Sequence, residues 1–374
     1  MRDAARRPMR RILLIQMKWM GDVILTTPAI RLLRRAYPDA RIDLLTRPPG
    51  AAAVEGNPYL DEVLVFRRGR ENTARMVREL ARRRYDAVID FRSTIRDTLF
   101  AVASRAPLRV GVQDSGLRRV LYTHTFPKER DGVYLARQKM ELLRPLGIEA
   151  GATRQLALDV VVGAAEHAWA ERILERLGLT GEEPIVAFSA VGRLPFKRWP
   201  AERWAEVADA VAARGARVLF THGPGEREQV RAVVERMRRP AAWDYEPGSP
   251  RQLAALYERC VLWVGNDGGP KHIAAAAGTP TISVMRWSIG SVWADTGAGV
   301  SDLYLEALPV LPCNPRRCGQ CAHLSCLVEL KTESVAAVVL RRLEDVAPEL
   351  ARRPDGAASA PAVKGPRRAR ARST

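Results

Sequence analysis

The sequence predicts an α/β protein made of two successive Rossmann-like domains, each a parallel sheet covered by helices. Short β-branched apolar runs alternate with amphipathic helical stretches through most of the 374 residues, a pattern typical of consecutive β-α-β units. The length also indicates two domains, because ordinary domains contain roughly 100–200 residues. Apolar residues make up 47% of the chain, so it can form buried cores without a disulfide scaffold.

The first half begins with a short buried strand, for which the apolar residues 12–15 are the evidence. A helix is expected from about residue 22 to residue 36, because apolar side chains recur there at helical spacing before Tyr37-Pro38 interrupts the pattern. Further strands are expected at residues 41–45, 63–66, 87–90 and 109–112. Between the strands at 63–66 and 87–90, a helix is marked by Met76, Val77, Leu80 and Ala81.

The second half repeats this alternation of strands and helices. Strands are expected at residues 184–188, 217–220, 262–264 and 281–284, and helices at 166–179, 203–213, 226–237, 252–259, 272–277 and 334–343. The predicted organisation is a basic N-terminal tail (1–11), a first domain (12–165), a second domain (166–333), a helix packing back toward the first domain (334–350) and a disordered basic tail (351–374).

The net charge of +18 is unevenly distributed along the chain. More than half of it lies in residues 1–11 and 352–374, two Arg-rich stretches that are too polar to pack into a core. Such tails can bind polyanions, for example nucleic acid, an anionic membrane surface or a phosphorylated glycolipid. The alternative is that they only increase solubility.

The apolar runs and the cysteine count indicate the compartment. The longest apolar runs fall well short of the roughly 20 residues that span a bilayer, and no apolar segment of a signal peptide follows the basic N-terminus. The five cysteines give no simple disulfide framework because their number is odd. The sequence therefore predicts a soluble, cytoplasmic protein.

The most informative loop follows the predicted strand at 262–264 and reads Asp267-Gly268-Gly269-Pro270-Lys271-His272. In open α/β sheets, ligands bind at the carboxyl ends of the strands. Gly268 and Gly269 allow a ligand to approach the backbone, and free N–H groups at the start of the next helix can bind phosphate oxygens. Asp267 can accept hydrogen bonds from sugar hydroxyls, whereas Lys271 and His272 can donate. The alternative is a tight, capped turn.

Two other strand-end loops of the second half carry candidate donor-site residues. Residues 189–200 combine Ser189 with cations that can clamp a diphosphate, Lys197 among them. At the next strand end, Glu226 can bind ribose hydroxyls. The alternatives are a solvated basic loop for the first segment and a favourable charge at a helix N-terminus for Glu226.

In the first half, the loop of residues 17–22 carries the candidate catalytic residue Asp22. A carboxylate at a helix N-terminus is often a simple cap, worth about 1 kcal/mol. If it faces an interdomain cleft, it can instead act as a general base on an acceptor hydroxyl. Lys18, Arg92 and Arg96 are candidate contacts for a phosphorylated acceptor, although solvated arginines are the commoner outcome.

Four of the five cysteines lie within fourteen residues near the end of the second half. The pair Cys318 and Cys321 has zinc-like spacing, and four thiolates can close a tetrahedral metal site. The flanking spacings of four residues are not diagnostic, so a metal site, a disulfide and free thiols all remain open. The cluster consists of Cys313, Cys318, Cys321 and Cys326.

Taken together, these motifs resemble the bacterial lipopolysaccharide heptosyltransferases of glycosyltransferase family 9. The likeness covers roughly residues 11–345 in the same order, and its Cys-rich loop looks like that of members which add later heptoses. The motifs that carry it are Lys18, Gly21-Asp22, Thr26-Thr27-Pro28-Ala29, Tyr37-Pro38-Asp39-Ala40, Lys197-Arg198-Trp199-Pro200, Gly223-Pro224-Gly225-Glu226, Asn266 to His272 and Gly278-Thr279-Pro280.

The resemblance implies a GT-B fold in which the first domain takes the acceptor and the second takes ADP-heptose. It implies an inverting transfer, without metal or other cofactor, to a sugar hydroxyl of the lipopolysaccharide inner core, a lipid-linked acceptor at the inner face of the membrane. Peripheral membrane association follows from that acceptor. On the matching positions, Asp22 is the general base, Lys197 a phosphate ligand, Glu226 a nucleotide contact, and residues 267–272 the sugar and diphosphate loop.

Two other functions remain as hypotheses. Gly268 and Lys271 stand where many family members carry Thr and Met, and residues 285–288 replace a common Gly-Pro-Thr. Because these changes lie on the donor side, another nucleotide sugar or glycan acceptor is the first alternative. The second is a nucleic-acid-binding protein, suggested by a pI of about 10.4, although no helix-turn-helix, zinc-finger or RRM pattern accompanies it.

Overall fold

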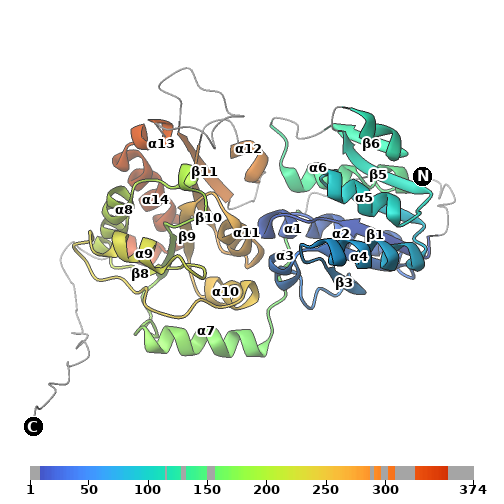
Figure 1. The fold of residues 1–374 in the computed structure, drawn as a ribbon. Coiled ribbons are helices and arrows are strands. Elements are labelled where there is room, and N and C mark those ends of the chain that lie inside the picture. Colours follow the sequence, from blue (N-terminus) through green and yellow to red (C-terminus); the bar gives the residue numbers. More distant parts are fainter. Residues whose placement is uncertain are drawn as a thin grey trace, which may run out of the picture.

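The computed structural model describes residues 9–113, 116–127, 132–149, 156–286, 290–295, 302–307 and 325–352. It contains two α/β domains, each built on a parallel sheet with helices on both faces (Figure 1). This arrangement confirms the predicted fold class. The predicted N-terminal tail lies outside the described residues up to position 8, and the C-terminal tail lies outside them from position 353.

In the described part of the N-terminal domain, the strand order is β3-β2-β1-β4-β5-β6, with all pairs parallel. Because β1 lies in the middle of the sheet, it is buried on both faces, which explains its continuous apolar sequence. The strands are β1 (Arg11–Ile15), β2 (Arg41–Thr46), β3 (Glu62–Val65), β4 (Ala87–Asp90), β5 (Leu108–Gln113) and β6 (His124–Pro127).

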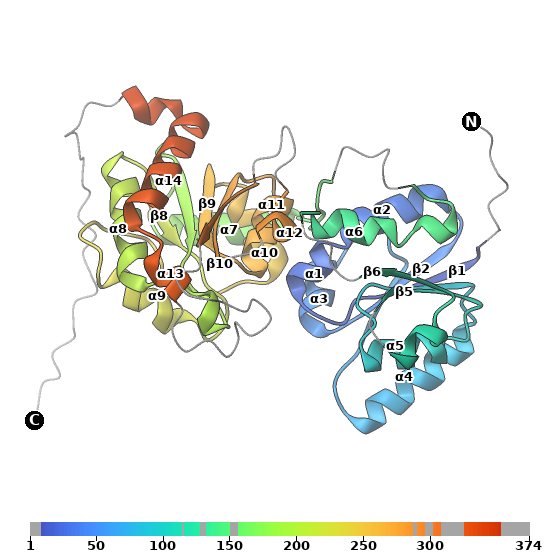
Figure 2. The ribbon, with the colours of Figure 1, turned by 90° about the horizontal axis from the view of Figure 1, so that it is seen from above.

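Helices cover the N-terminal sheet on both faces (Figure 2). One face packs against α2 (Thr27–Ala36) and α6 (Leu135–Glu141), and the other against α4 (Arg70–Arg83) and α5 (Ile95–Ala103). Alternate residues of β1 serve the two layers, since Ile12 and Leu14 belong to one buried cluster and Leu13 and Ile15 to the other. The remaining helices are α1 (Met20–Ile24), α3 (Pro48–Ala53), η1 (Leu117–Leu121) and η2 (Arg144–Leu146).

The single helix expected over residues 22–36 is in fact two helices, α1 and α2. They are separated at Leu25 and Thr26, just before Pro28, which has no N–H to continue a helical ladder. The hydroxyls of Thr26 and Thr27 donate to the carbonyls of Asp22 and Ile24, both at 2.7 Å. The break allows α1 to point toward the second domain while α2 stays on the sheet.

In the described part of the C-terminal domain, the strand order is β11-β10-β9-β7-β8, again with parallel pairs. The strands are β7 (Ile185–Ser189), β8 (Arg217–Phe220), β9 (Leu262–Asn266), β10 (Thr281–Arg286) and β11 (Asp302–Ala307). The helices are α7 (Ala164–Arg176), η4 (Pro195–Lys197), α8 (Ala201–Ala213), α9 (Arg227–Val234), α10 (Pro250–Tyr257), α11 (Gly269–Ala276), α12 (Gly290–Trp293), α13 (Ser325–Glu329), α14 (Thr332–Val346) and η6 (Pro348–Arg352).

An aromatic cluster in the C-terminal core fixes one of the predicted site loops. Trp199, at the end of that loop, is buried edge-to-face on Trp204 of α8, with ring centroids 4.9 Å apart. Trp204 in turn packs against Phe188 of β7. Buried aromatic pairs of this geometry contribute packing energy beyond the area that they bury, so the loop is held at both ends by the core.

The expectation that the C-terminal helix packs back toward the first domain is wrong. Helix α14 lies on α8 within the C-terminal domain, and its buried side chains Val335, Val339 and Leu343 belong to the same core as Trp204. These apolar residues recur at helical spacing and form one stripe. The stripe shows that the helix has a buried face but does not say which domain supplies the partner.

Several elements carried no sequence signal. Strand β6 is a partly exposed sheet edge of sequence His-Thr-Phe-Pro, which shows no apolar run and includes a proline that only an edge tolerates. Strand β11 lies at the edge of the other sheet and, among the described residues, pairs with β10 alone. Helix α3 starts with two prolines and continues with Gly and Ala, so its pattern has no amphipathic period. Helix α6 was also not expected.

The two domains contact each other mainly through α1 and α11, and also through α3 and α10. The chain between them, at residues 156–162, runs along the first domain, where Arg31 Nη1 lies 2.5 Å from Asp159 Oδ1. Within the described residues, no helix is both long enough and apolar enough to cross a bilayer. The facing ends of α1 and α11 form the main part of the junction between the domains.

Candidate functional site

The N-termini of α1 and α11 meet at a close contact around Gly21 and Gly269. A Cβ added to Gly21 would lie 2.7 Å from the Cδ2 atom of His272, and one added to Gly269 would lie 2.6 Å from the Cε atom of Met20. Because β1 leads into α1 and β9 leads into α11, the contact joins the carboxyl ends of two central strands. This is where open α/β sheets bind ligands.

Asp22 lies in the first turn of α1 and is buried. Its Oδ2 atom accepts a hydrogen bond of 3.1 Å from the N–H of Trp19, so the carboxylate does cap the helix. The same residue also lines a cavity between the domains. The capping and the cleft-facing interpretations of Asp22 are therefore compatible in this geometry.

The cavity beside Asp22 has a volume of about 240 Å³. It is bounded mainly by the N-terminal domain and closed on one side by Trp293 of the C-terminal domain. Its polar lining comes from Asp22, Arg92, Thr94, Gln138, Lys139 and Glu141, and its apolar lining includes Phe91, Phe126 and Leu135. The arrangement suits a ligand with hydroxyls and negative charge.

Lys139 is a charged residue of this cavity that the sequence did not reveal. It is buried on α6, where its ammonium donates to Gln16 Oε1 at 2.6 Å and lies 5.2 Å from the centre of the Phe91 ring. Gln16 in turn donates to the carbonyl of Lys18. No local motif marks Lys139, because its partner lies 123 positions away in the chain.

Lys18 and Trp19 sit at the edge of the cleft in a strongly cationic environment. Partial burial lowers the pKa of Lys18, and nearby guanidinium groups lower it further, Arg92 of its own domain and Arg193 of the other among them. The Trp19 ring lies 5.2 Å from the Lys18 ammonium and 3.9 Å from the Arg193 guanidinium. Arg193 therefore contacts the first domain across the cleft through a cation–π interaction.

Arg92 is held at the cavity by a buried carboxylate. Asp90 Oδ1 accepts the N–H groups of Arg92 and Ser93 at 3.0 and 2.8 Å, and Oδ2 accepts the Tyr122 hydroxyl at 2.6 Å. Burial raises the pKa of Asp90 to about 7, and the nearby carboxylate of Asp97 adds to the rise. Ser93 adopts a φ of 52°, a left-handed conformation that this network stabilises.

Arg96, the third predicted acceptor contact, is not part of the cavity lining. It lies on the exposed side of α5, with its guanidinium 5.6 Å from the centre of the Phe66 ring. Arg92 and Arg96 were both expected from the sequence to contact a phosphorylated acceptor because they are basic. The turn at Ser93 separates them, so that Arg92 turns into the cleft while Arg96 stays on the outer helix.

On the donor side, two of the predicted loops lie against each other. The Lys197 ammonium forms an ion pair with Asp267 Oδ2, and Asp267 is almost completely buried. Asn266 braces the same junction, because its Oδ1 accepts the N–H of Trp199 at 3.0 Å and its Nδ2 donates to the carbonyl of Val191 at 3.3 Å. The loops at 189–200 and 266–272 thus form one surface.

Ser189 and Gly265 explain why the two strands beneath these loops lie so close. A Cβ on Gly265 would lie 2.7 Å from the carbonyl oxygen of Ser189, so only glycine fits there. Ser189 itself is buried at the end of β7. Its backbone supports the loop, while Gly268 and Gly269 form the entry to α11 as predicted, with Gly268 in extended conformation.

Lys271 does not face the cleft in this structure. Its side chain is fully buried, its ammonium lies 2.6 Å from Asp302 Oδ2, and it also donates to the carbonyl of Trp293. Asp302 further accepts the Thr281 hydroxyl at 2.6 Å and the Asp295 N–H at 3.1 Å. The ion pair of Lys271 and Asp302, with the hydrogen bond to Trp293, links α11 to α12 and β11. Asp302 and Trp293 were not predicted from the sequence as partners of Lys271.

His272 is buried in the first turn of α11, where it is held in its neutral form. Burial lowers its pKa well below the usual value, and the charges of Lys271 and Lys197 lower it further. Its ring centre lies 6.1 Å from that of Trp293. Among the described residues, its Nδ1 atom has no hydrogen-bond partner. A neutral imidazole at this position adds no positive charge to the loop.

Glu226 caps its own loop in this structure. It precedes α9, and its Oε2 atom accepts the N–H of Gly223 at 2.8 Å. The geometry therefore matches the structural alternative for Glu226, and the nucleotide contact stays a prediction.

Of the four clustered cysteines, Cys313, Cys318 and Cys321 lie outside the described residues. Cys326 lies in the first turn of α13 and is half-buried, and neither it nor the buried Cys260 forms a disulfide with another described residue. Within the described ranges, no group of three or more His, Cys, Asp or Glu side chains is arranged to hold a metal ion.

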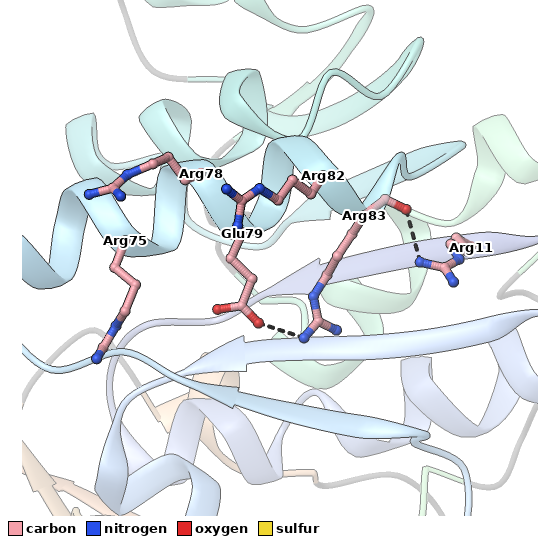
Figure 3. A pocket seen from close by; sticks show the side chains of 6 residues that line it. All are labelled: Arg11, Arg75, Arg78, Glu79, Arg82 and Arg83. Carbon is pink, nitrogen blue, oxygen red and sulfur yellow. Dashed lines mark hydrogen bonds and ion pairs between the residues drawn. The ribbon is translucent and has the colours of Figure 1, made fainter.

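A second cavity, of about 370 Å³, lies on α4 far from the cleft (Figure 3). It is lined by Arg11, Arg75, Arg78, Glu79, Arg82 and Arg83. Arg83 is engaged by Glu79 at 2.6 Å and by Glu62 at 2.8 Å, and Arg11 donates to the Arg83 carbonyl at 3.0 Å. Because Arg11 starts β1, this cavity is at the opposite end of the sheet from Asp22.

Comparisons with known proteins identify the family to which the chain is similar. The family model described as glycosyltransferase family 9 (heptosyltransferase) matches residues 73–303. The lipopolysaccharide heptosyltransferase 3 of Escherichia coli K12 is 29% identical over 289 residues, which cover 72% of this chain and 80% of that protein.

Two solved structures extend the similarity to the fold. The glycosyl transferase family 9 protein of Veillonella parvula is 26% identical with a TM-score of 0.76, over 90% of this chain and 97% of that one. The E. coli ADP-heptose lipopolysaccharide heptosyltransferase II is 19% identical with a TM-score of 0.69, over 90% of this chain and 99% of that one. The similarity therefore spans both domains.

The buried pair beneath the donor loop yields a stability prediction. Replacing Asp302 by Asn leaves the Lys271 charge buried without a counter-charge, so the free energy of unfolding should fall by roughly 3–5 kcal/mol. Adding Lys271→Met should recover a large part of that loss in urea unfolding. The control is Glu344→Gln in the surface pair with Arg214, expected to change stability by about 0–1 kcal/mol. Equal effects of both changes would contradict the assignment.

The raised pKa of Asp90 predicts a pH dependence of stability. Its folded-state pKa of about 7 lies above the unfolded value of about 3.9. The contribution of Asp90 is therefore greatest at acid pH and is lost as the pH rises through about 7. Asp90→Asn should flatten the decline in unfolding free energy between about pH 4 and about pH 7, the range between the unfolded and folded pKa values. Parallel curves for both proteins would disprove this assignment.

Proposed function

We propose that the chain, which belongs to glycosyltransferase family 9 and is a glycosyltransferase, transfers a heptose from ADP-heptose. The acceptor is a sugar hydroxyl of the lipopolysaccharide inner core. The observation that carries the proposal is the contact between α1 and α11, which sets Asp22 and the loop of residues 267–272 at one cleft. The E. coli relative is named a lipopolysaccharide heptosyltransferase, which supports the donor and acceptor classes.

The C-terminal side of the cleft binds the diphosphate of the donor. Lys197 supplies a cation, and the first-turn N–H groups of α11 supply donors that helical bonding leaves free. Ser189, Gly268 and Gly269 shape this surface, and Glu226 lies at the end of the next strand for the nucleotide. Lys271 acts indirectly, because its ion pair with Asp302 holds α11 in place.

Neutral His272 has a distinct role in this scheme. Because its pKa is lowered, it does not compete with Lys197 for the negative charge, and its polar ring borders the sugar. Asp267, which forms an ion pair with Lys197, belongs to the same loop as His272 and accepts hydrogen bonds from the sugar hydroxyls. The loop therefore separates a cationic phosphate region from a neutral sugar region.

The chemistry is a single displacement at the anomeric carbon. The acceptor hydroxyl oxygen forms the new bond to that carbon, and its proton passes to the Asp22 carboxylate. The bond to the donor's phosphate oxygen breaks on the opposite face, and the nucleoside diphosphate leaves with the electron pair. Fixed cations and N–H groups stabilise the charge that develops on it. The configuration at the anomeric carbon is inverted.

The acceptor enters from the N-terminal side, along the cavity of about 240 Å³. Arg92 and Lys139 line it with positive charge, and Lys18, which is outside the lining, lies close enough to Arg92 to feel its charge; this suits a phosphorylated core oligosaccharide. Arg96 is outside this lining and contacts neither the cavity nor Asp22. Such an acceptor is lipid-linked, so the enzyme works at the inner face of the membrane as a peripheral protein.

The proton transfer to Asp22 is tested by Asp22→Asn. The amide cannot accept the proton, so kcat should fall roughly a hundredfold or more, while the donor Kd stays within about twofold because Asp22 belongs to the acceptor side. The matched control is Asp39→Asn, an exposed carboxylate of the same domain. Turnover by Asp22→Asn close to that of the control would remove Asp22 from the role of base.

The phosphate contact is tested by Lys197→Ala. Loss of the cation also leaves Asp267 without its partner, so ADP-heptose should bind roughly tenfold to a hundredfold more weakly in calorimetry. Lys331→Ala, an exposed lysine of the same domain, should bind normally. A donor panel analysed by product mass spectrometry identifies the sugar, and preference for a different nucleotide sugar would replace the heptose assignment.

A further inference from the structure

The N-terminal domain exposes an apolar surface on α5 and η1, here called the apolar patch (Ile95, Leu99, Val102, Leu117 and Val120). The exposed fraction is 78% for Ile95, 89% for Leu117 and 77% for Val120. Ile95, Leu99 and Val102 recur at helical spacing and share one side of α5. Single exposed apolar residues are ordinary, whereas a contiguous group marks an interaction site.

The two elements of the apolar patch are joined into one surface. Helix α5 packs against η1, and Arg118 of η1 donates to the Ser93 carbonyl just before α5 at 2.8 Å. The hydroxyls of Thr98 and Tyr122 lie 2.9 Å apart in the layer beneath. Phe100 and Ala101, on the other side of α5, enter the core. The patch therefore stands on a rigid base.

Positive charge surrounds the apolar patch. In residues 91–105 and 116–121, the only acidic side chain is Asp97, which is buried and accepts the N–H of Thr94 at 3.3 Å. Helix α4, beside α5 on the same face of the sheet, adds exposed arginines. The arginines in the two stretches are Arg92, Arg96, Arg105, Arg118 and Arg119.

The position of the apolar patch relative to the cleft is also informative. Thr94 lines the cavity beside Asp22, and Ile95 is the next residue in the chain. Arg92 lines the same cavity. If the acyl chains of lipids contacted this patch, the lipid headgroups would thus lie near the acceptor side of the cleft.

We infer that the apolar patch and its arginines dock the enzyme onto an anionic membrane. The apolar side chains enter the boundary between headgroups and acyl chains, and the guanidinium groups contact lipid phosphates. Apolar residues with a border that is mainly arginine, with Glu71 of α4 as an exposed acidic exception, complement an anionic lipid bilayer, whose surface offers phosphate charge above an apolar layer. The inference deepens the proposed function and depends on it only for the nature of the acceptor.

The test is cosedimentation of the full-length protein with vesicles of equal parts phosphatidylglycerol and phosphatidylethanolamine. Leu117→Ser with Val120→Ser should weaken binding by roughly tenfold or more, because each side chain loses apolar burial. Arg119→Gln should weaken it by roughly fivefold. Vesicles of phosphatidylcholine alone should bind the unmodified protein more weakly, because they carry no net negative charge.

Matched controls separate the apolar patch from other surfaces. Val328→Ser replaces an exposed valine of the C-terminal domain and should bind vesicles normally, as should Arg172→Glu on α7. The basic segments 1–11 and 352–374 remain in every variant, so full vesicle binding by Leu117→Ser with Val120→Ser would assign binding to other parts of the chain and overturn the inference. A residual, salt-resistant component lost only in patch variants supports it.

Two further measurements separate membrane docking from self-association and from a defect in catalysis. If the protein is dimeric without lipid and the patch substitutions make it monomeric, the surface belongs to a second copy and the inference fails. Transfer to a detergent-dispersed acceptor should be unchanged in the patch variants, and transfer to the same acceptor in vesicles should fall. Vesicle binding is measured without acceptor or donor, so it remains decisive even if the chain transfers a different sugar.

Discussion

The close contact between Gly21 and His272 is the constraint on which the rest of the site depends. A side chain at Gly21 would collide with the imidazole ring, so the two helices meet only because the first has none there. The break between α1 and α2 at Thr26 and Pro28 frees α1 to make this approach. One small residue and one helix break thus bring the carboxyl ends of β1 and β9 to the same cleft.

Two buried ion pairs then fix the donor side with different consequences. The pair of Lys271 and Asp302 is fully enclosed and ties α11 to β11, which gives the loop its position. The pair of Lys197 and Asp267 is buried only on the carboxylate side, so the ammonium stays at the surface of the cleft. A buried charge is costly without its partner. Both pairs therefore limit which substitutions the loop tolerates, but only the second can exchange its partner for a ligand.

The sequence predicted the features that local patterns encode. The strand–glycine–helix order around Gly268 and the alternation of strands and helices were correct because each depends on neighbouring residues. Lys139 and Asp302 were missed because their partners, Gln16 and Lys271, lie far away in the chain. Arg96 was expected to contact the acceptor because it is basic, but it lies beyond the left-handed turn at Ser93 and outside the cavity lining. Long-range pairing and backbone turns are thus the features that local sequence patterns did not reveal.

Charge couples the two halves of the cleft. Lys18 and Arg92 of the first domain face Arg193 of the second, and their mutual repulsion contributes to the lowered pKa of Lys18. Arg193 nevertheless approaches the first domain because the face of Trp19 attracts its guanidinium. An anion between the domains reduces the repulsion and favours the same approach. The cleft is therefore electrostatically suited to an anionic ligand, which lowers the cost of holding these cations near one another.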